Sequence, residues 1–409
     1  MSTPDRLVTR PFLAVAAATA AFFVYVGVLV PLVPRFVEDE LGGGEFGVGL
    51  AIAAFALSAI AARPLITRLA DQYGRRAVMV AGGLTAGAAG SVAGLTNSLP
   101  VFLALRGLTG VGEAALFVAA ATLIADLAPP HRRAEAASYF SVAVFGGIGV
   151  GPVFGEAILG DDRFVLAFAT AAGFAVLAAL MSTMVPDRVG PVVAAPRREG
   201  RARLIHPAAI GPGLVLGSGI AAFAVFSAFL PDHARDVGLS GSGPFFAVYS
   251  IVCVVLRIAG ARLPERLGPR RSVTIALVTV AVALTLLAGV AQPWALWVSA
   301  ATIGVGMAFL YPSLMAMTVD RVEPHERAAA VSSFTMFFEI GSAVGGLALG
   351  GVAELAGKRV GFLGGVIMCA AGLYLMRTYV VPRASATAPG SRPEPTMRPD
   401  AVFVPVAGD

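Results

Sequence analysis

The chain has 409 residues, of which 57% are hydrophobic and only 13% are charged, and its mean hydropathy is +0.81. A soluble protein of this length would divide into two or three domains with polar surfaces, so the composition excludes that class. The net charge of +5 reflects where basic residues sit relative to a membrane, and it gives no indication of nucleic-acid binding.

Apolar runs of about 20 residues recur along the whole chain, the length that a helix needs to cross a hydrocarbon core of about 30 Å. Glycine and proline inside these runs are compatible with helix, because transmembrane bundles tolerate both. The predicted spans are 12–33, 46–69, 77–96, 100–124, 134–159, 164–185, 208–230, 244–263, 272–290, 294–318, 328–352 and 360–381. We therefore expect an all-α, multi-pass membrane protein with twelve helices.

The basic residues indicate how the spans are oriented. Of the 30 Lys and Arg, 24 lie at ends and loops on the side of the N-terminus, and this set includes Arg63 and Arg257. Because positive residues stay cytoplasmic, both termini are expected in the cytoplasm. The loop "RFVEDELGGGE" after the first span is acidic and is expected outside.

A basic, proline-rich connection divides the chain near its middle. The predicted units are an N-terminal six-helix half (1–185), a cytoplasmic linker (186–207), a C-terminal six-helix half (208–381) and a disordered cytoplasmic tail (382–409).

The two halves repeat each other at one offset, 194 residues. The stretch "RPLITRLADQYGRR" at 63–76 returns as "RIAGARLPERLGPR" at 257–270. "GVG" at 110–112 and "DLAPPHRR" at 126–133 return at the same spacing as "GVG" and "DRVEPHER". Such repeats are typical of secondary transporters, in which two halves rock about a site near the membrane midplane.

The stretch "DQYGRR" at 71–76 resembles the signature of the major facilitator superfamily for the turn between helices two and three, and the resemblance extends over residues 10–381. The chain departs from that signature at Thr67, where the family usually has Gly, and at Gln72, where a basic residue is usual. The resemblance implies a major facilitator fold with two pseudo-symmetric six-helix halves.

The repeated turn is interpreted as a conformational latch, and the alternative is charge that only sets topology. A glycine permits a positive φ, an acid attracts the N-terminal end of a facing helix, and arginines pair with acids or lipid phosphates. The predicted latch residues are Asp71, Gly74, Arg75, Arg76, Glu265, Gly268 and Arg270.

Three further stretches resemble signatures of exporters in that superfamily. "RGLTGVGEAA" at 106–115 resembles the fourth-helix signature, and "PLVP" at 31–34 resembles the first-helix signature of the twelve-helix drug:proton antiporters. "GIGVGPVFGE" at 147–156 resembles the fifth-helix signature, and Glu156 at its end is interpreted as a solvated helix end. Its small residues predict either helix packing or an exporter-type interface between the halves. These residues are Gly147, Gly151, Pro152 and Gly155.

Three charges fall deep inside predicted spans. Glu113 lies 13 residues from both Pro100 and Asp126, about 20 Å at 1.5 Å per residue, and Glu339 is similarly deep. Arg106 precedes Glu113 by two turns on the same helix face. A carboxylate at this depth must face a cavity, pair with a cation or be protonated. Carboxyls so placed can bind and release protons near neutral pH, which proton coupling requires.

The half-repeat favours a functional role for these charges. The equivalents of Arg106, Glu113 and Glu339 are Ala300, Met307 and Phe145, whereas a feature needed by the fold would recur in both halves. We predict that the three charges couple transport to protons, and the alternative is a structural Arg–Glu pair.

The resemblance implies that spans one, four, seven and ten line a central cavity. An aromatic cavity with one or two acids suits a hydrophobic or cationic organic compound, although core or lipid-facing positions are the alternative for each aromatic residue. The predicted cavity residues are Phe22, Tyr25, Glu113, Phe117, Phe223, Phe226, Phe309, Tyr311 and Glu339.

The sequence contains no phosphate-binding loop, metal-ligand spacing or nucleophile–base set, so we predict no enzyme, no catalytic residues, no metal and no cofactor other than the proton gradient. The favoured hypothesis is a proton-coupled exporter of a small drug or metabolite, acting as a monomer in a bacterial cytoplasmic membrane. Its expected partners are the small-molecule substrate, protons and the lipid bilayer. One alternative is a nutrient importer or facilitator, which would be expected to carry more polar cavity residues. Another is a sensor or scaffold with a carrier fold.

Overall fold

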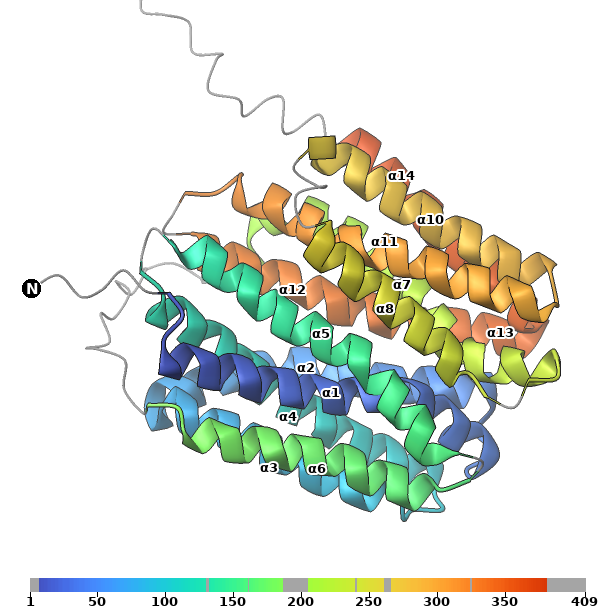
Figure 1. The fold of residues 1–409 in the computed structure, drawn as a ribbon, viewed down its shortest axis with the longest axis horizontal. Helices are drawn as coiled ribbons and strands as arrows, with labels where there is room; N and C mark the ends of the chain where they lie inside the picture. The colour runs from blue at the N-terminus through green and yellow to red at the C-terminus, as the bar shows by residue number, and fades with distance from the viewer. Residues whose placement is uncertain are drawn as a thin grey trace, which may run out of the picture.

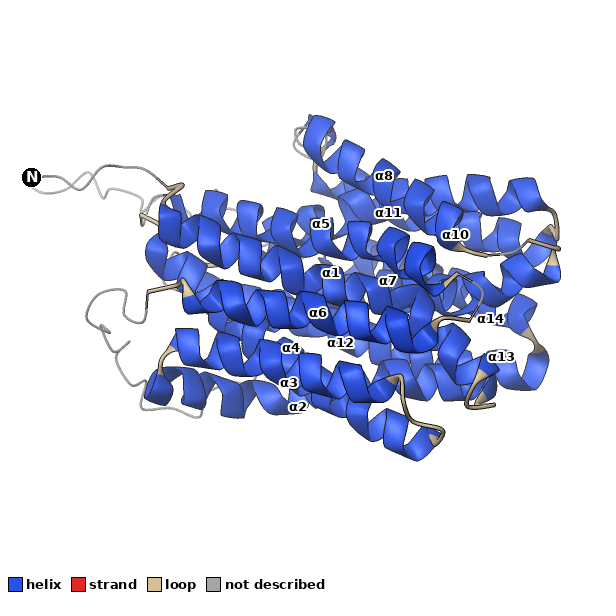
Figure 2. Ribbon diagram, turned by 60° about the horizontal axis from the view of Figure 1, so that its bottom comes forward, coloured by secondary structure: helices blue, strands red, loops and turns tan. Residues whose placement is uncertain are grey.

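The computed structural model describes residues 7–129, 132–160, 162–186, 205–239, 241–260, 266–323 and 326–380. Within these ranges the chain consists of helices joined by short loops, and it contains no strand (Figure 2). Residues 187–204 of the predicted linker and the predicted tail lie outside the described residues, as does Glu265.

The first half of the chain forms six helices. They are α1 (Arg10–Asp39), α2 (Gly44–Tyr73), α3 (Arg75–Ala93), α4 (Leu99–Leu127), α5 (Arg133–Leu159) and α6 (Phe164–Thr183). Each overlaps one predicted span, and α1 and α2 extend beyond the predicted apolar core at both ends.

The second half forms six more membrane-spanning helices, two of which contain a π-helical segment. They are α7 (Pro207–Asp236), α8 (Gly243–Ala259), α10 (Pro269–Gly289), α11 (Pro293–Val319), the continuous run of α12 (Arg327–Val344), η2 (Gly345–Leu349) and α13 (Gly350–Ala356), and the run of α14 (Lys358–Leu375) and η3 (Met376–Val380). The twelve predicted spans are therefore confirmed.

The helices run along one common direction in two groups (Figure 1). The blue and green helices α1 to α6 gather on one side of the bundle, and the yellow to red helices gather on the other. The halves contact each other where α2 meets α12, η2 and α13, where α5 meets α8, and where α1 meets α7. We call the end that holds the start of α1 and the Gly74 turn the basic end, and the opposite end, which holds Asp39 and Asp236, the acidic end.

Glycines of the exporter-like fifth-helix motif pack against α1 within the same half. A Cβ placed on Gly151 would lie 2.5 Å from the backbone of Gly27, so only glycine allows this approach. Of the two interpretations of this motif, the structure therefore supports helix packing. The same contact recurs in the second half at the offset of 194, where Gly341 faces Gly217 and Gly345 faces the Ala221 backbone.

A second glycine contact joins the two halves near the acidic end. Gly49 of α2 lies against the π-helical segment η2, where a Cβ on Gly49 would overlap the carbonyl of Gly346. Single π-helical turns of this kind occur frequently at functional sites.

The two turns of the predicted latch have the same backbone conformation. Gly74 has φ of 89° and Gly268 has φ of 79°, in the region that side-chain-bearing residues disfavour. Both turns therefore use the positive φ that a glycine permits.

Candidate transport site

A small cavity lies between the two halves, at the level of the two buried acids. Its volume is about 70 Å³, and α1, α2, α4, α5, α11 and α12 all contribute to its wall. The wall is mostly aromatic or aliphatic. The lining residues are Phe23, Phe55, Ala56, Glu113, Phe117, Phe140, Ser141, Val144, Phe145, Ile148, Tyr311, Thr335, Phe338, Glu339 and Ser342. Sites for drug-sized ligands enclose about 300 to 1,000 Å³, so an organic molecule requires the halves to move apart here.

A buried ion pair joins the two halves at one wall of the cavity. Arg63 of α2 donates from Nη2 to Oε1 of Glu339 on α12 over 2.6 Å, and from Nη1 to the Thr335 hydroxyl over 3.4 Å. The Arg63 and Glu339 side chains are only 7% and 9% exposed. Buried charges of this kind persist only when they are paired and hydrogen-bonded.

The prediction that Arg63 lies at a basic end or loop is therefore wrong. Arg63 lies ten residues before the end of α2 at Tyr73, and its side chain is directed into the bundle. The partner of Glu339, which the sequence left open, is this arginine.

Glu113 of α4 faces the same cavity from the N-terminal half. Its side chain is buried, and Oε2 has no hydrogen-bond partner among the described residues. Arg63 and Glu339 both lie near enough to Glu113 to act on it electrostatically. Two carboxyl groups therefore share one arginine, and the cluster can hold one proton without an additional cation.

Arg106, the third predicted coupling residue, is placed apart from Glu113. Its guanidinium lies 4.8 Å from the centre of the Phe55 ring and donates to the Thr109 hydroxyl over 3.4 Å. Phe55 lines the cavity, so Arg106 lies behind an aromatic wall. The structure brings Glu113 and Glu339 together and does not bring Arg106 into direct contact with them.

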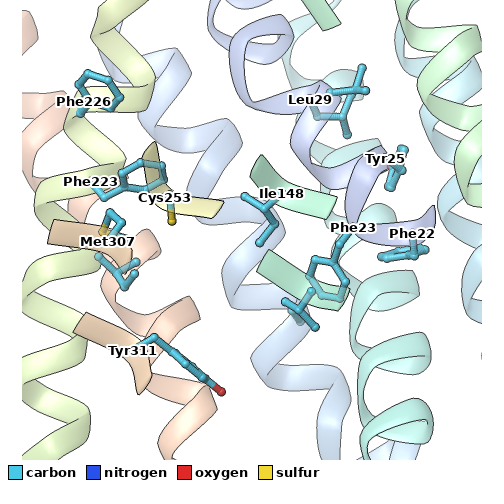
Figure 3. Packing of buried hydrophobic residues seen from close by; sticks show 14 of the residues in the cluster. Phe22, Phe23, Tyr25, Leu29, Ile148, Phe223, Phe226, Cys253, Met307 and Tyr311 are labelled. Carbon is cyan, nitrogen blue, oxygen red and sulfur yellow. The ribbon is translucent and has the colours of Figure 1, made fainter. Parts of the chain in front are cut away.

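The predicted aromatic residues divide into two groups. Phe117 and Tyr311 line the cavity, and in Figure 3 Tyr311 extends from α11 toward the N-terminal half. The others belong to the cores of the two halves and do not line this cavity. They are Phe22, Tyr25, Phe223, Phe226 and Phe309.

Local contacts explain why those aromatic side chains turn away. The Tyr25 hydroxyl donates to the Ala86 carbonyl of α3 over 3.3 Å, and Phe223 stacks near Tyr249 with ring centroids 5.3 Å apart. On α1 it is Phe23, the residue directly after Phe22, that lines the cavity (Figure 3).

Arg257 of α8 occupies the position in the second half that Arg63 occupies in the first. Its guanidinium lies 4.0 Å from the centre of the Phe145 ring on α5, and Nη2 donates to the Met307 carbonyl over 3.0 Å. Phe145 lines the cavity and packs on Tyr311, with ring centroids 4.7 Å apart. Arg257 therefore lies in the wall between the halves, although the sequence analysis placed it at a basic end.

The acidic end is held closed by ion pairs between the halves. Arg235 of α7 bonds Asp39 over 2.6 Å and Glu38 over 3.0 Å on α1. The carboxylates of Glu38, Glu45 and Asp232 converge to within 4.8 Å beside Arg235. Arg235 already serves as the cation for two of these carboxylates, so the group is explained as part of this closure.

Glu156 is a second closing contact and not the solvated helix end that the sequence analysis expected. Its side chain is only 8% exposed, lies 3.6 Å from Arg35, and accepts a hydrogen bond from Ser242, the residue directly before α8. It therefore joins α5 to α8 across the two halves.

At the basic end the predicted latch residues lie near the surface. Arg75 forms an ion pair with Asp126 of α4 in the same half, whereas the Asp71 and Arg270 side chains are exposed. This arrangement ties the turn between α2 and α3 to its own half. The role of a latch between conformations stays a prediction.

Comparison with known proteins identifies relatives over nearly the whole chain. The Major Facilitator Superfamily model matches residues 13–278 and 214–406. An MFS-type transporter of Burkholderia mallei is 26% identical over 382 residues, covering 90% of this chain and 91% of the relative. Multidrug resistance protein 2 of Bacillus subtilis is 26% identical over 276 residues, covering 64% of this chain and 68% of the relative.

Solved transporter structures share this fold at low sequence identity. The nucleoside transporter NupG superposes with a TM-score of 0.69 at 14% identity, covering 93% of this chain and 100% of that one. A bacterial homologue of the human lysosomal transporter Spinster, in an inward-facing and occupied conformation, gives 0.71 at 17% identity, covering 97% and 100%. At these identities the likeness shows the fold alone.

Proposed function

Because the chain belongs to the Major Facilitator Superfamily, we propose that this membrane transporter exports a small hydrophobic or cationic organic molecule in exchange for protons. The observation that carries the proposal is that Glu113 and Glu339 share one aromatic cavity between the halves, with Arg63 as their cation. The multidrug resistance protein of Bacillus subtilis among the relatives supports an exporter.

The proposed cycle uses competition between a proton and the substrate for the same carboxyl group. Glu113 has an oxygen without a hydrogen-bond partner among the described residues, so a cationic substrate or a proton can occupy that place. When one of them is bound to the carboxyl group, the other binds there more weakly. This competition couples the movement of protons in one direction to the movement of substrate in the other.

The direction of transport follows from an orientation that we also propose, with the acidic end outside and both termini in the cytoplasm. In that orientation the ion pairs of Arg235 close the route to the exterior. The cavity in this conformation would then exchange its contents with the cytoplasm, where an exporter takes up its substrate. Entry of protons from outside would release the substrate after the halves have rocked.

The test is a proton-flux measurement in proteoliposomes with an imposed pH gradient and a pH-reporting dye inside. A panel of lipophilic cations, neutral drugs and sugars is added to wild type, to Glu113→Gln and to Glu40→Gln. The last variant is the matched control, because Glu40 is an exposed acid at the acidic end.

We expect a proton flux that appears only with an organic compound, is abolished in Glu113→Gln and persists in Glu40→Gln. Substrate flux without proton movement in wild type would instead identify a facilitator, and the proposed antiport would be wrong.

A further inference from the structure

The two arginines of the opening repeat make equivalent contacts across the interface between the halves. Arg63 and Arg257 are separated by the offset of 194, and so are the positions that they contact on the opposite half, 145 and 339. Arg63 contacts Glu339 on α12, and Arg257 contacts Phe145 on α5. The bundle therefore builds the same cross-interface contact twice, with a different partner each time.

Only one of these two contacts neutralises its arginine. Glu339 supplies a carboxylate to Arg63, whereas position 145 offers Arg257 the face of an aromatic ring. The Met307 carbonyl accepts a hydrogen bond from one of the five N–H groups of Arg257. The buried Nε of Arg257 has no hydrogen-bond partner among the described residues. A ring face and a carbonyl attract a guanidinium, but neither carries a compensating negative charge.

Arg257 does not itself line the cavity, but the ring that covers it belongs to the opposite half, so Arg257 is uncovered when the halves move apart; Arg106, in contrast, is covered by Phe55 of its own half. The ring on which Arg257 lies, Phe145, lines the cavity, and so does Tyr311, which lies within the electrostatic reach of Arg257. The opposite wall carries Glu113, an acid with an unpaired oxygen among the described residues. The cavity wall thus holds one acid from each half, Glu113 and Glu339, and Arg257 lies directly behind the lining ring Phe145 at the interface between the halves.

We propose that the substrate is a zwitterionic aromatic compound whose carboxylate binds Arg257. This inference rests on the proposed function and makes its substrate class more specific. The cationic group of the substrate lies at Glu113, its apolar body contacts the aromatic wall, and its carboxylate takes the place that Glu339 takes for Arg63. The planar fork of a guanidinium matches a carboxylate through two parallel hydrogen bonds, which a lysine would not reproduce.

The inference is tested by binding of two dyes that differ in one group. Rhodamine 19 carries a cationic ring system and a free carboxylate, and rhodamine 6G is the ethyl ester of the same dye. Fluorescence anisotropy with the detergent-purified protein gives both dissociation constants without any proton gradient. We expect wild type to bind the free acid about tenfold more tightly than the ester, the effect of one charge-assisted hydrogen-bonding group.

Two variants assign the preference to Arg257. Arg257→Gln is expected to bring the ratio of the two dissociation constants to about one, mainly by weakening the free acid. Phe145→Glu places an acid at the position equivalent to Glu339, and it should abolish the preference by pairing with Arg257. Arg68→Gln removes an exposed charge of α2 and should keep the wild-type ratio.

Equal affinities in wild type, or a preference that survives in both Arg257→Gln and Phe145→Glu, would overturn the inference. This result is separable from failure of the antiport proposal. If Glu113→Gln keeps its proton flux while the dye ratio still depends on Arg257, coupling is wrong and the anion-binding position stands.

Discussion

Removing one member of the Arg63–Glu339 pair should destabilise this arrangement of the halves far more than removing both. The two side chains are 7% and 9% exposed and are joined over 2.6 Å. Once Glu113, the second acid near Arg63, is replaced by Gln, the loss of either member leaves an uncompensated charge in the bundle. Breaking a buried pair in this way costs about 3 to 5 kcal/mol, whereas replacing both partners with apolar residues of similar volume is nearly neutral or stabilising. The variants Arg63→Met, Glu339→Met and their combination, each made in the Glu113→Gln background, form a double-mutant cycle.

Thermal unfolding in detergent measures this cycle through the two cysteines of the chain. Cys253 and Cys369 are free and buried, so a thiol-reactive dye reports their exposure when the bundle opens. For a chain of this size each kcal/mol moves the unfolding midpoint by about 1 to 2 °C. We therefore expect each single variant to lower the midpoint by roughly 3 to 10 °C, and the double variant to recover most of that loss.

A matched control cycle uses the ion pair between Arg235 and Asp39 at the acidic end. Those side chains are 36% and 27% exposed, and exposed pairs of this kind contribute no more than about 1 kcal/mol. The Arg63–Glu339 cycle should show a coupling energy well above that of the control. If its two single effects add to within about 0.5 kcal/mol in the double variant, the pair does not hold the halves together and the reasoning fails.

Two further predictions concern the contacts that close the acidic end. Ser242 is buried at this end, so a cysteine placed there (Ser242→Cys) reports opening through its labelling by a membrane-impermeant thiol reagent. Adding Arg235→Gln should speed this labelling by up to about fivefold, since the ion pairs lost are worth about 1 kcal/mol. An unchanged rate would show that these ion pairs do not restrain the acidic end. Gly49→Ala should lower stability by about 1 to 3 kcal/mol and slow transport, because the added methyl group overlaps the backbone of η2. The control Gly146→Ala has no atom within 4 Å of the new methyl group, and equal effects of the two substitutions would contradict this explanation.

The helices could be predicted from the sequence because hydrocarbon thickness imposes their length. Their ends are less predictable, since a helix continues beyond the apolar core wherever packing and ion pairs stabilise it. Helix α1 extends to Asp39, past Arg35, because both side chains bond partners on other helices. Helix α7 similarly extends to Asp236, which forms an ion pair with Lys358.

The depth of a residue in the bundle could be predicted more reliably than its direction. Glu113 and Glu339 were predicted as buried acids, and both line the cavity. The prediction of Phe22 in place of Phe23 shows the limit, because consecutive residues on a helix point about 100° apart. Aromatic content alone does not say which of two adjacent rings faces the partner half.

Arg63 was missed because a charge near the end of an apolar run is usually a marker of topology. The available signal was its distance from the turn: it lies two to three helical turns before Tyr73, where a side chain remains inside the bundle. Its recurrence as Arg257 was visible as well, but the acid at 339 and the aromatic residue at 145 gain their meaning only when the interface between the halves is known.

The repeat separates what both halves need for folding from what occurs in only one half. The glycine turns at 74 and 268, and the glycine contacts of 151 and 345, are present twice because the helices of each half turn and pack in the same way. Glu113 and Glu339 are present once, opposite Met307 and Phe145 in the repeat, and both line the one cavity that the two halves share. Arg63 and Arg257 belong to both categories. Their positions are symmetric and their partners are not: Arg63 pairs with Glu339 of the opposite half, whereas Arg257 lies on the Phe145 ring, which carries no compensating charge.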